Sequence, residues 1–171
     1  TTDANGVASL TLNAPILVGS ATITAAAAGL SSSVAVTYIP DVPDVVTISA
    51  SPASVGVSAD STLTAAVYDQ YGNVTPNEPV TFSIATNLSG AVLSNPTGSA
   101  QTNASGIATM VYTSGTTPGG NDTLQVTAVN GSAPSKTTDI SVSTGANVIA
   151  GLTLTQEQPS TAMQVGDTQI L

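Results

Sequence analysis

The sequence predicts an all-β protein built from tandem β-sandwich modules. One observation is an internal repeat, because residues 1–12 and 101–112 share a polar turn, a glycine and then alternating small or apolar residues. The two copies lie about 100 residues apart, which is the size of one sandwich domain. The other observation is that apolar and polar residues alternate through most of the remaining chain, and no window has a helical period.

Residues 1–40 are predicted to be the C-terminal part of one module. Strands are expected at Gly6–Leu12, Ser20–Ala27 and Ser33–Ile39, since small or apolar side chains occupy alternate positions in each. The segment Pro40–Asp44 follows, and its prolines cannot donate to a β-ladder. We therefore expect this segment to link two modules.

Residues 41–144 are predicted to be one complete module. Alternating apolar residues define its strands, and turns rich in Gly, Pro, Asn and Asp separate them. Pro52 is expected to break the first strand, because proline is confined to strand edges and ends. The expected strands are Val45–Ala50, Ser61–Tyr68, Pro79–Ala85, Ala91–Ser94, 106–113, Asp122–Val129 and Lys136–Val142.

Residues 145–171 repeat the start of that module about 106 residues later. They are therefore predicted to be the N-terminal part of the next module. The two terminal parts hold no counterpart of residues 65–100, and neither can close a sandwich alone. The chain is expected to be a window of a longer polypeptide. The alternative is that its ends pair with other chains by strand addition and form a fibre.

Composition narrows the function classes. Hydrophobic residues make up 41% of the chain, enough for a packed core, but charged residues are only 6%, against about 25% in typical soluble domains. The net charge is −9, and Lys136 is the only basic residue. A chain with so few cations cannot neutralise phosphates, which argues against nucleic-acid binding and attraction to anionic lipid.

The sequence also argues against chemistry that needs cysteine or histidine and against insertion into a membrane. The chain has no cysteine and no histidine, so disulfides, thiol or histidine catalysis and ordinary zinc sites are excluded. Its most apolar run, Ala21–Leu30, is too short to cross a bilayer, and no direct membrane insertion is expected in this segment.

Several stretches of the complete module combine turn residues with alternating strands: Leu63–Pro76, Pro79–Ser83, Gly90–Ser94, Asn103–Thr109 and Leu124–Ala128. Together they resemble bacterial Ig-like domains of the invasin/intimin type. The resemblance implies an all-β fold of tandem Ig-like β-sandwiches of about 100 residues each, in an extracellular array on a bacterial surface protein. It also implies neighbouring modules of the same chain as partners, and it supplies no catalytic residues.

The linker offers a candidate metal site. Asp41 and Asp44 flank it, and carboxylates together with backbone carbonyls are the ligands that calcium prefers. A calcium ion there would stiffen the joint between modules. The alternative is that both carboxylates are solvated linker charges. The stretches Asp3–Gly6 and Asp69–Asn73 resemble calcium loops superficially, but they lack the later ligands and are predicted to be Asx turns.

Sugar attachment is permitted by Asn-x-Ser/Thr sequons. In a chain so rich in Ser and Thr, chance gives nearly as many, so the sequons alone do not predict glycosylation. They occur at Asn73, Asn87, Asn103, Asn121 and Asn130.

Three classes of function then compete. The first is a non-catalytic structural segment, stalk or fibre, of a bacterial surface protein or adhesin, including a filament subunit joined to other copies by strand addition. The second is a module that binds a glycan or a host protein through its loops. The third is an enzyme that uses paired carboxylates, but the carboxylates are scattered and no histidine supports them. No enzyme is predicted.

Overall fold

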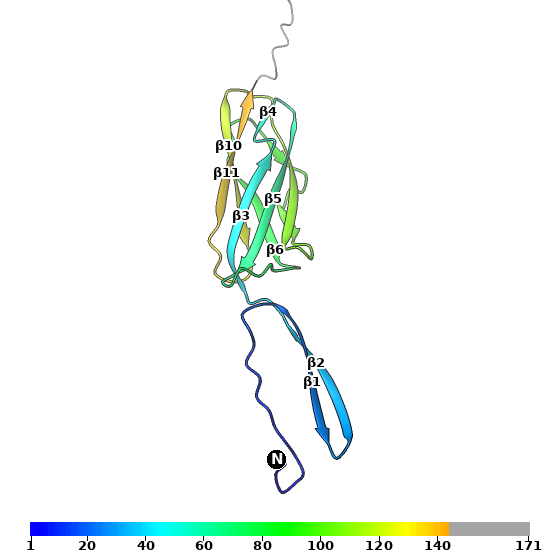
Figure 1. Cartoon of the computed structure of the whole chain (residues 1–171). Helices are drawn as coiled ribbons and strands as arrows, with labels where there is room; N and C mark the ends of the chain where they lie inside the picture. The colour runs from blue at the N-terminus through cyan, green and yellow to red at the C-terminus, as the bar shows by residue number, and fades with distance from the viewer. Residues whose placement is uncertain (144–171) are drawn as a thin grey trace, which may run out of the picture.

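The computed structural model describes residues 1–143, and these residues form an all-β structure with strands β1 to β11. No helix that could span a membrane occurs in this part of the chain. A hairpin part, residues 1–40, is arranged end to end with a β-sandwich, and β11 ends at the far end of that sandwich (Figure 1). The N-terminal part of a further module, expected at residues 145–171, lies outside the described residues.

The sandwich consists of two sheets. The four-stranded sheet has the order β3-β5-β9-β7, and the five-stranded sheet has the order β4-β11-β10-β6-β8. Neighbouring strands are antiparallel, except that β4 and β11 run parallel. The strands are β3 (Pro43–Ser51), β4 (Ser54–Gly56), β5 (Asp60–Asp69), β6 (Pro79–Thr86), β7 (Val92–Leu93), β8 (Ser99–Gln101), β9 (Ile107–Thr113), β10 (Gly120–Ala128) and β11 (Lys136–Ser143).

The core lies between the sheets and follows the predicted alternation. In β5, Leu63, Ala65 and Val67 are fully buried, while the intervening residues face outward. Side chains from both sheets complete the core, as the period of two along a strand requires. The largest are Tyr112, Phe82, Leu124, Ile140, Val46 and Val80. The predicted fold class, an Ig-like β-sandwich, is confirmed.

Two details of this module differ from the sequence prediction. Strands β4 and β8 were not predicted, because three residues are too few to show an alternation. The linker prediction was wrong for its last two residues, since Pro43 begins β3 and is buried. A proline is tolerated as the first residue of a strand, where its missing amide hydrogen removes no ladder bond. Pro52 does end the strand, because β3 stops at Ser51.

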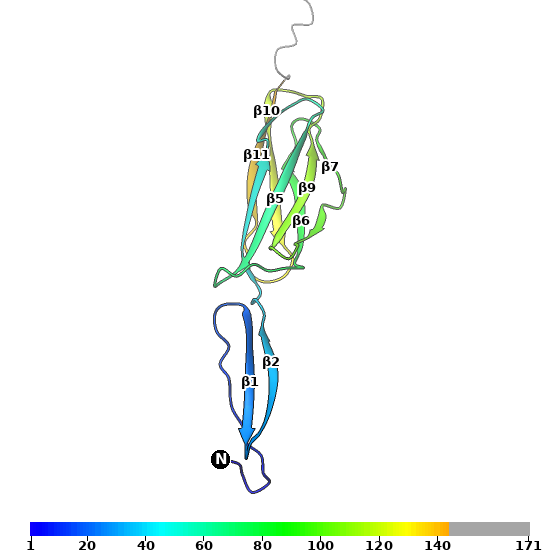
Figure 2. The same cartoon turned by 45° about the vertical axis from the view of Figure 1, so that its right-hand side comes forward.

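The hairpin part contains β1 (Gly19–Ala27) and β2 (Leu30–Tyr38). The predicted strand at Gly6–Leu12 was wrong, because residues 7–15 have no ladder partner and run alongside the hairpin as extended chain (Figure 2). The repeat counterpart of this stretch, β9, is a strand because β5 and β7 pair with it on both sides. Residues 1–40 hold no counterpart of either partner strand, so the same local pattern forms no strand.

Candidate inter-module joint

Three segments meet where the hairpin part joins the sandwich. They are the loop Asp69–Asn73 at the end of β5, the linker at Asp41, and residues 16–18 that precede β1. The loop is short because Gly72 takes a φ of +84°, which a residue without a side chain adopts readily. We call this set of contacts the joint.

Asp69 holds the loop closed and binds the linker. Its side chain is only 1% exposed. One carboxylate oxygen, Oδ1, accepts hydrogen bonds from the backbone N–H groups of Tyr71 and Asn73, both at 2.9 Å. The other, Oδ2, accepts from Asn73 Nδ2 at 2.8 Å and from the Asp41 N–H at 3.1 Å. The loop is therefore an Asx turn, as predicted, and its carboxylate also anchors the linker.

The charge state of Asp69 follows from these contacts. Burial by itself raises the pKa of the carboxyl group, but hydrogen bonds from Asn73, Asp41 and Tyr71 stabilise the ionised form. The balance lowers the pKa from its ordinary value of 3.8. Asp69 is therefore an anion at neutral pH, and it accepts charge-assisted hydrogen bonds from its neighbours.

Asn73 connects the loop to the hairpin part. Its side chain is 8% exposed. Besides its bond to Asp69, Nδ2 donates to the Ile16 carbonyl oxygen at 2.8 Å, and Oδ1 accepts from the Val18 N–H at 3.2 Å. A side-chain amide presents a carbonyl oxygen that accepts and an NH₂ group that donates, side by side as in a peptide group. Asn73 thus binds residues 16–18 through their backbone, much as a neighbouring strand would.

Asp41 and Asp44 occupy different surroundings. Asp41 Oδ2 accepts from Gln70 Nε2 at 3.0 Å, and its Oδ1 accepts from the Val42 N–H at 2.8 Å. Asp44 is exposed on β3. Within residues 1–143, no three acidic, cysteine or histidine side chains gather as a metal site. Calcium binding at Asp41 and Asp44 stays a prediction.

A second set of contacts braces the start of β3. The Pro43 carbonyl oxygen accepts from the Ser132 N–H at 3.0 Å. Gly131 approaches that carbonyl so closely that a Cβ there would collide with it, and its φ is +79°. Glu78, only 7% exposed, accepts from Asn130 N and Nδ2 at 2.9 and 3.1 Å. This turn was not predicted, although the Asn130–Gly131 dipeptide is a common turn signal, and the contact with β3 could not be predicted from it.

The sequon asparagines fall into two groups. Asn73, Asn87 and Asn130 use their side-chain nitrogens as donors, to Ile16 and Asp69, to Ala91 and to Glu78 respectively. A sugar on Asn73 would disrupt the joint. Asn103 and Asn121 are exposed, and their side-chain nitrogens make no hydrogen bond within the described part of the chain. Glycan attachment stays a prediction, and these two residues offer the free amides.

Another buried carboxylate lies toward the opposite end of the sandwich and was not singled out from the sequence. Asp122 is fully buried and accepts hydrogen bonds from the N–H groups of Leu88 and Ser89, at 2.7 and 3.0 Å, and from the hydroxyls of Ser89 and Tyr112. Burial and the neighbouring Asp122 carboxylate raise the pKa of Tyr112 to about 12. Burial alone would raise the pKa of Asp122, yet the donated bonds lower it. The cluster braces the two sheets.

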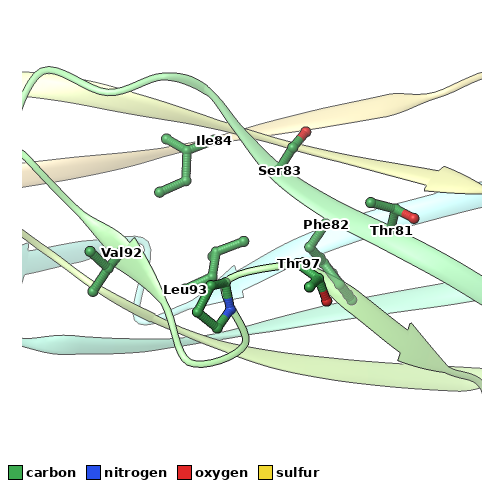
Figure 3. A pocket seen from close by; sticks show the side chains of 8 residues that line it. Thr81, Phe82, Ser83, Ile84, Val92, Leu93 and Thr97 are labelled. Atoms are coloured by element: carbon green, nitrogen blue, oxygen red, sulfur yellow. The ribbon is translucent and has the colours of Figure 1, made fainter.

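An apolar groove of about 420 Å³ lies at the edge of β6. Strand β8 pairs with β6 only as far as Thr81, so the later part of β6 faces the groove. Figure 3 shows Ile84 of β6 near Val92 and Leu93 of β7. No charged side chain lines this groove. It therefore offers apolar contact but no convergent polar groups that would select a ligand.

Comparisons with known proteins agree with this architecture. No family model matches the chain, and no curated protein matches its sequence. Among solved structures, the Escherichia coli adhesin FdeC matches with a TM-score of 0.54 and 18% identity over 74% of this chain and 41% of that one. The Yersinia pseudotuberculosis adhesin InvE matches with a TM-score of 0.51 and 16% identity over 82% of this chain and 51% of that one.

Weaker matches include other kinds of protein. The S-layer protein rSbsC matches with a TM-score of 0.44 and 19% identity over 78% of this chain and 18% of that one. One match is an enzyme, a glycosyl hydrolase family 2 member from Bacteroides cellulosilyticus. The chain spans about half the length, or less, of these structures. At these identities the likeness concerns the fold alone, and the chain has the Ig-like β-sandwich fold that also occurs in bacterial adhesins.

Proposed function

We propose that this chain is a non-catalytic structural segment of a bacterial extracellular surface protein or adhesin, in which tandem Ig-like modules are held in a fixed relative orientation. The observation that carries the proposal is the joint. A buried carboxylate and a side-chain amide at one end of the sandwich bind both the linker and the backbone of the preceding part. The fold shared with FdeC and InvE supports a place on the cell surface.

The energetics of the joint favour one orientation over free rotation. Three hydrogen bonds join the loop to the linker and the hairpin part. The Asp41 and Val18 N–H groups donate to the loop, and the loop donates to the Ile16 carbonyl oxygen. A fourth links Gln70 to Asp41. Each such bond contributes about 0.5–1.5 kcal/mol net. Their sum is enough to hold one arrangement in most molecules, whereas a linker without such contacts leaves modules free to move.

The surroundings of the buried acidic residues support the non-catalytic part of the proposal. Asp69, Glu78 and Asp122 each have both carboxylate oxygens engaged by hydrogen-bond donors. A pair of carboxylates that acts on a glycosidic bond has to present its oxygens to that bond, and these oxygens are held by donors of the protein itself. The extracellular location follows from the proposed class of protein.

The orientation can be measured as a distance across the joint. The chain has no cysteine, so spin labels can be placed on cysteines introduced at Ser31, at the hairpin tip, and at Thr116, in a loop at the far end. Both positions are exposed. Electron–electron double resonance should give one narrow distance distribution in the parent chain. Asn73→Ala removes the bonds to Ile16 and Val18, so the distribution should broaden.

Asn103→Ala is the matched control. Asn103 also closes a turn, through Oδ1 bonds from Ser105 and Ile107, but it makes no bond to the hairpin part. Its distribution should stay as narrow as that of the parent. A broad distribution in the parent chain would refute a fixed joint, and an unchanged distribution in Asn73→Ala would refute the role assigned to that residue.

A further inference from the structure

The first and last strands of the sandwich connect to the rest of the chain at opposite ends of the molecule. Strand β3 begins at Pro43, next to the linker, and β11 ends at Ser143, at the far end (Figure 1). A pull on the chain from both sides therefore acts along the long axis of the sandwich. It draws β3 toward the joint and β11 in the opposite direction.

The short strand β4 joins these two strands directly. It follows β3 closely in the chain, and it pairs in parallel with the end of β11, where Val55 lies opposite Val142. The Ser141 N–H donates to the Ala53 carbonyl oxygen at 3.0 Å, and the Ser143 hydroxyl donates to the Val55 carbonyl oxygen at 3.3 Å. The β4–β11 ladder is thus a direct bridge between the two strands that a pull would load.

The direction of this ladder decides how it responds to a pull. Strand β3 is already extended, so it cannot lengthen and passes the pull on to β4. Strand β4 then has to slide along β11, because the two strands are drawn in opposite directions. The ladder bonds run across the strands, so the pull loads all three residue pairs together rather than one after another.

The surroundings of the β4–β11 ladder make its bonds costly to open. Val55 is 6% exposed and Val142 is 2% exposed, and both belong to the core. A backbone bond that breaks there leaves its donor and acceptor unsatisfied, since water does not reach them readily. On the other side of β11, the Gly119 N–H donates to the Val142 carbonyl oxygen at 2.8 Å, and β10 pairs with β11 along most of its length. The end of β11 is therefore held from both sides.

We propose that the β4–β11 ladder makes the sandwich a load-bearing module, which resists tension between the linker and the residues that follow β11. The ladder has to slide as a whole before the core can open. This goes beyond the proposed function, because a fixed joint sets the direction of the module, whereas the ladder sets the force that the module withstands. A flexible joint in the spin-label experiment would leave this inference unaffected.

Single-molecule force spectroscopy can compare two directions of pull on the same chain. The chain has no cysteine, so handles can be attached to cysteines introduced in pairs. The pair Val42→Cys, Thr144→Cys pulls along the axis and loads the β4–β11 ladder as a whole. The pair Thr116→Cys, Thr144→Cys pulls on the end of the β10–β11 hairpin where Gly120 faces Val142, and it opens the residue pairs one after another.

The unfolding force should be at least about twofold higher along the axis, because several residue pairs have to break together in that direction. The length gained on unfolding, about 3.3–3.6 Å for each released residue, shows which part of the sandwich has opened. Equal forces in the two directions, or a lower force along the axis, would overturn the proposal.

Two proline substitutions in β11 test the ladder itself. The Ser141 N–H points toward β4, and the N–H of Thr137 points to the same side of β11, at a level that β4 does not reach. Both side chains are exposed. Ser141→Pro removes the bond to Ala53, so it should lower the unfolding force along the axis. Thr137→Pro is the matched control, because it places the same ring in the same strand without removing a ladder bond to β4.

Urea unfolding of both variants separates this effect from a general loss of stability. Forced unfolding depends on the unfolding rate rather than on the equilibrium stability. Ser141→Pro should therefore lose more force along the axis than Thr137→Pro, and it should lose much less in the hairpin direction. Equal axial forces in the two variants would overturn the role of the β4–β11 ladder. If Ser141→Pro does not fold, the comparison of the two directions in the parent chain decides by itself.

Discussion

Replacing Asp69 by asparagine tests whether one carboxylate holds the loop and the linker together. Each oxygen of Asp69 accepts two hydrogen bonds. An amide at this position keeps only one oxygen, and its NH₂ group then points at two donors, whichever way the side chain is turned. Two donors lose their acceptor, and each such loss costs about 1–3 kcal/mol. The side chain lies at the end of the sandwich, where water relieves part of the cost, so we expect a loss of about 2–4 kcal/mol.

Urea unfolding of the full chain, followed by circular dichroism, measures this loss. The matched control is Asp60→Asn, because Asp60 is exposed and accepts a single bond, from Thr113 Oγ1 at 2.7 Å. Its effect should stay below about 1 kcal/mol, as for an exposed polar contact. Equal effects of the two substitutions would refute the role assigned to Asp69.

The dependence of folding stability on pH tests separately whether the negative charge of Asp69 stabilises the fold. Folding lowers the pKa of Asp69 below 3.8, so the carboxylate contributes stability above that pH, and the contribution is lost as pH falls through the folded-state pKa. The stability difference between the parent and Asp69→Asn should therefore be full at neutral pH and shrink in acid. Asp122, whose pKa is also lowered, is present in both proteins and cancels in the difference. A difference that persists unchanged in strong acid would contradict the charge-based account.

Three further predictions concern other parts of the sandwich and the linker. Tyr112→Phe should destabilise the sandwich by about 1–3 kcal/mol, because Asp122 loses a donor in a buried site. In the parent, the stability that Tyr112 contributes should be full below pH 10, the ordinary pKa of tyrosine, and should fall as pH rises from 10 to about 12, the raised pKa of Tyr112 in the folded protein. Urea unfolding at alkaline pH measures this, and an equal pH dependence in Tyr112→Phe would contradict it. Gly131→Ala should destabilise the fold by more than the roughly 1–2 kcal/mol that a left-handed backbone costs a residue with a side chain, because the new Cβ also collides with Pro43. The control Gly119→Ala introduces the backbone strain alone, since no atom lies near its Cβ position. Equal losses of stability in urea unfolding would show that the collision with Pro43 has no effect. Calcium at Asp41 and Asp44 would narrow the distance distribution across the joint, so a chelator should broaden it, and an unchanged distribution would show that these carboxylates hold no calcium at the joint.

Much of the molecule is determined by patterns that a short stretch of sequence carries. The alternation of Leu63, Ala65 and Val67 suffices to predict β5 and its buried face, because successive side chains of any strand point to opposite sides. The Asx turn at Asp69 is local as well, since the carboxylate binds N–H groups two and four residues ahead. The repeat at residues 101–112 predicts the size of the modules, because a repeat offset measures domain length directly.

Other features were decided only by the tertiary structure. The stretch Gly6–Leu12 has the pattern of a strand yet forms none, because a strand exists only where a second segment pairs with it. The joint depends on Asn73 meeting Ile16 and Val18, which lie more than fifty residues earlier in the chain. Asp122 is buried at an inward strand position, where it needs donors from two other segments to remain ionised. Alternation and turns are properties of neighbouring residues, whereas pairing, docking and burial of charge depend on segments that only the folded chain brings together.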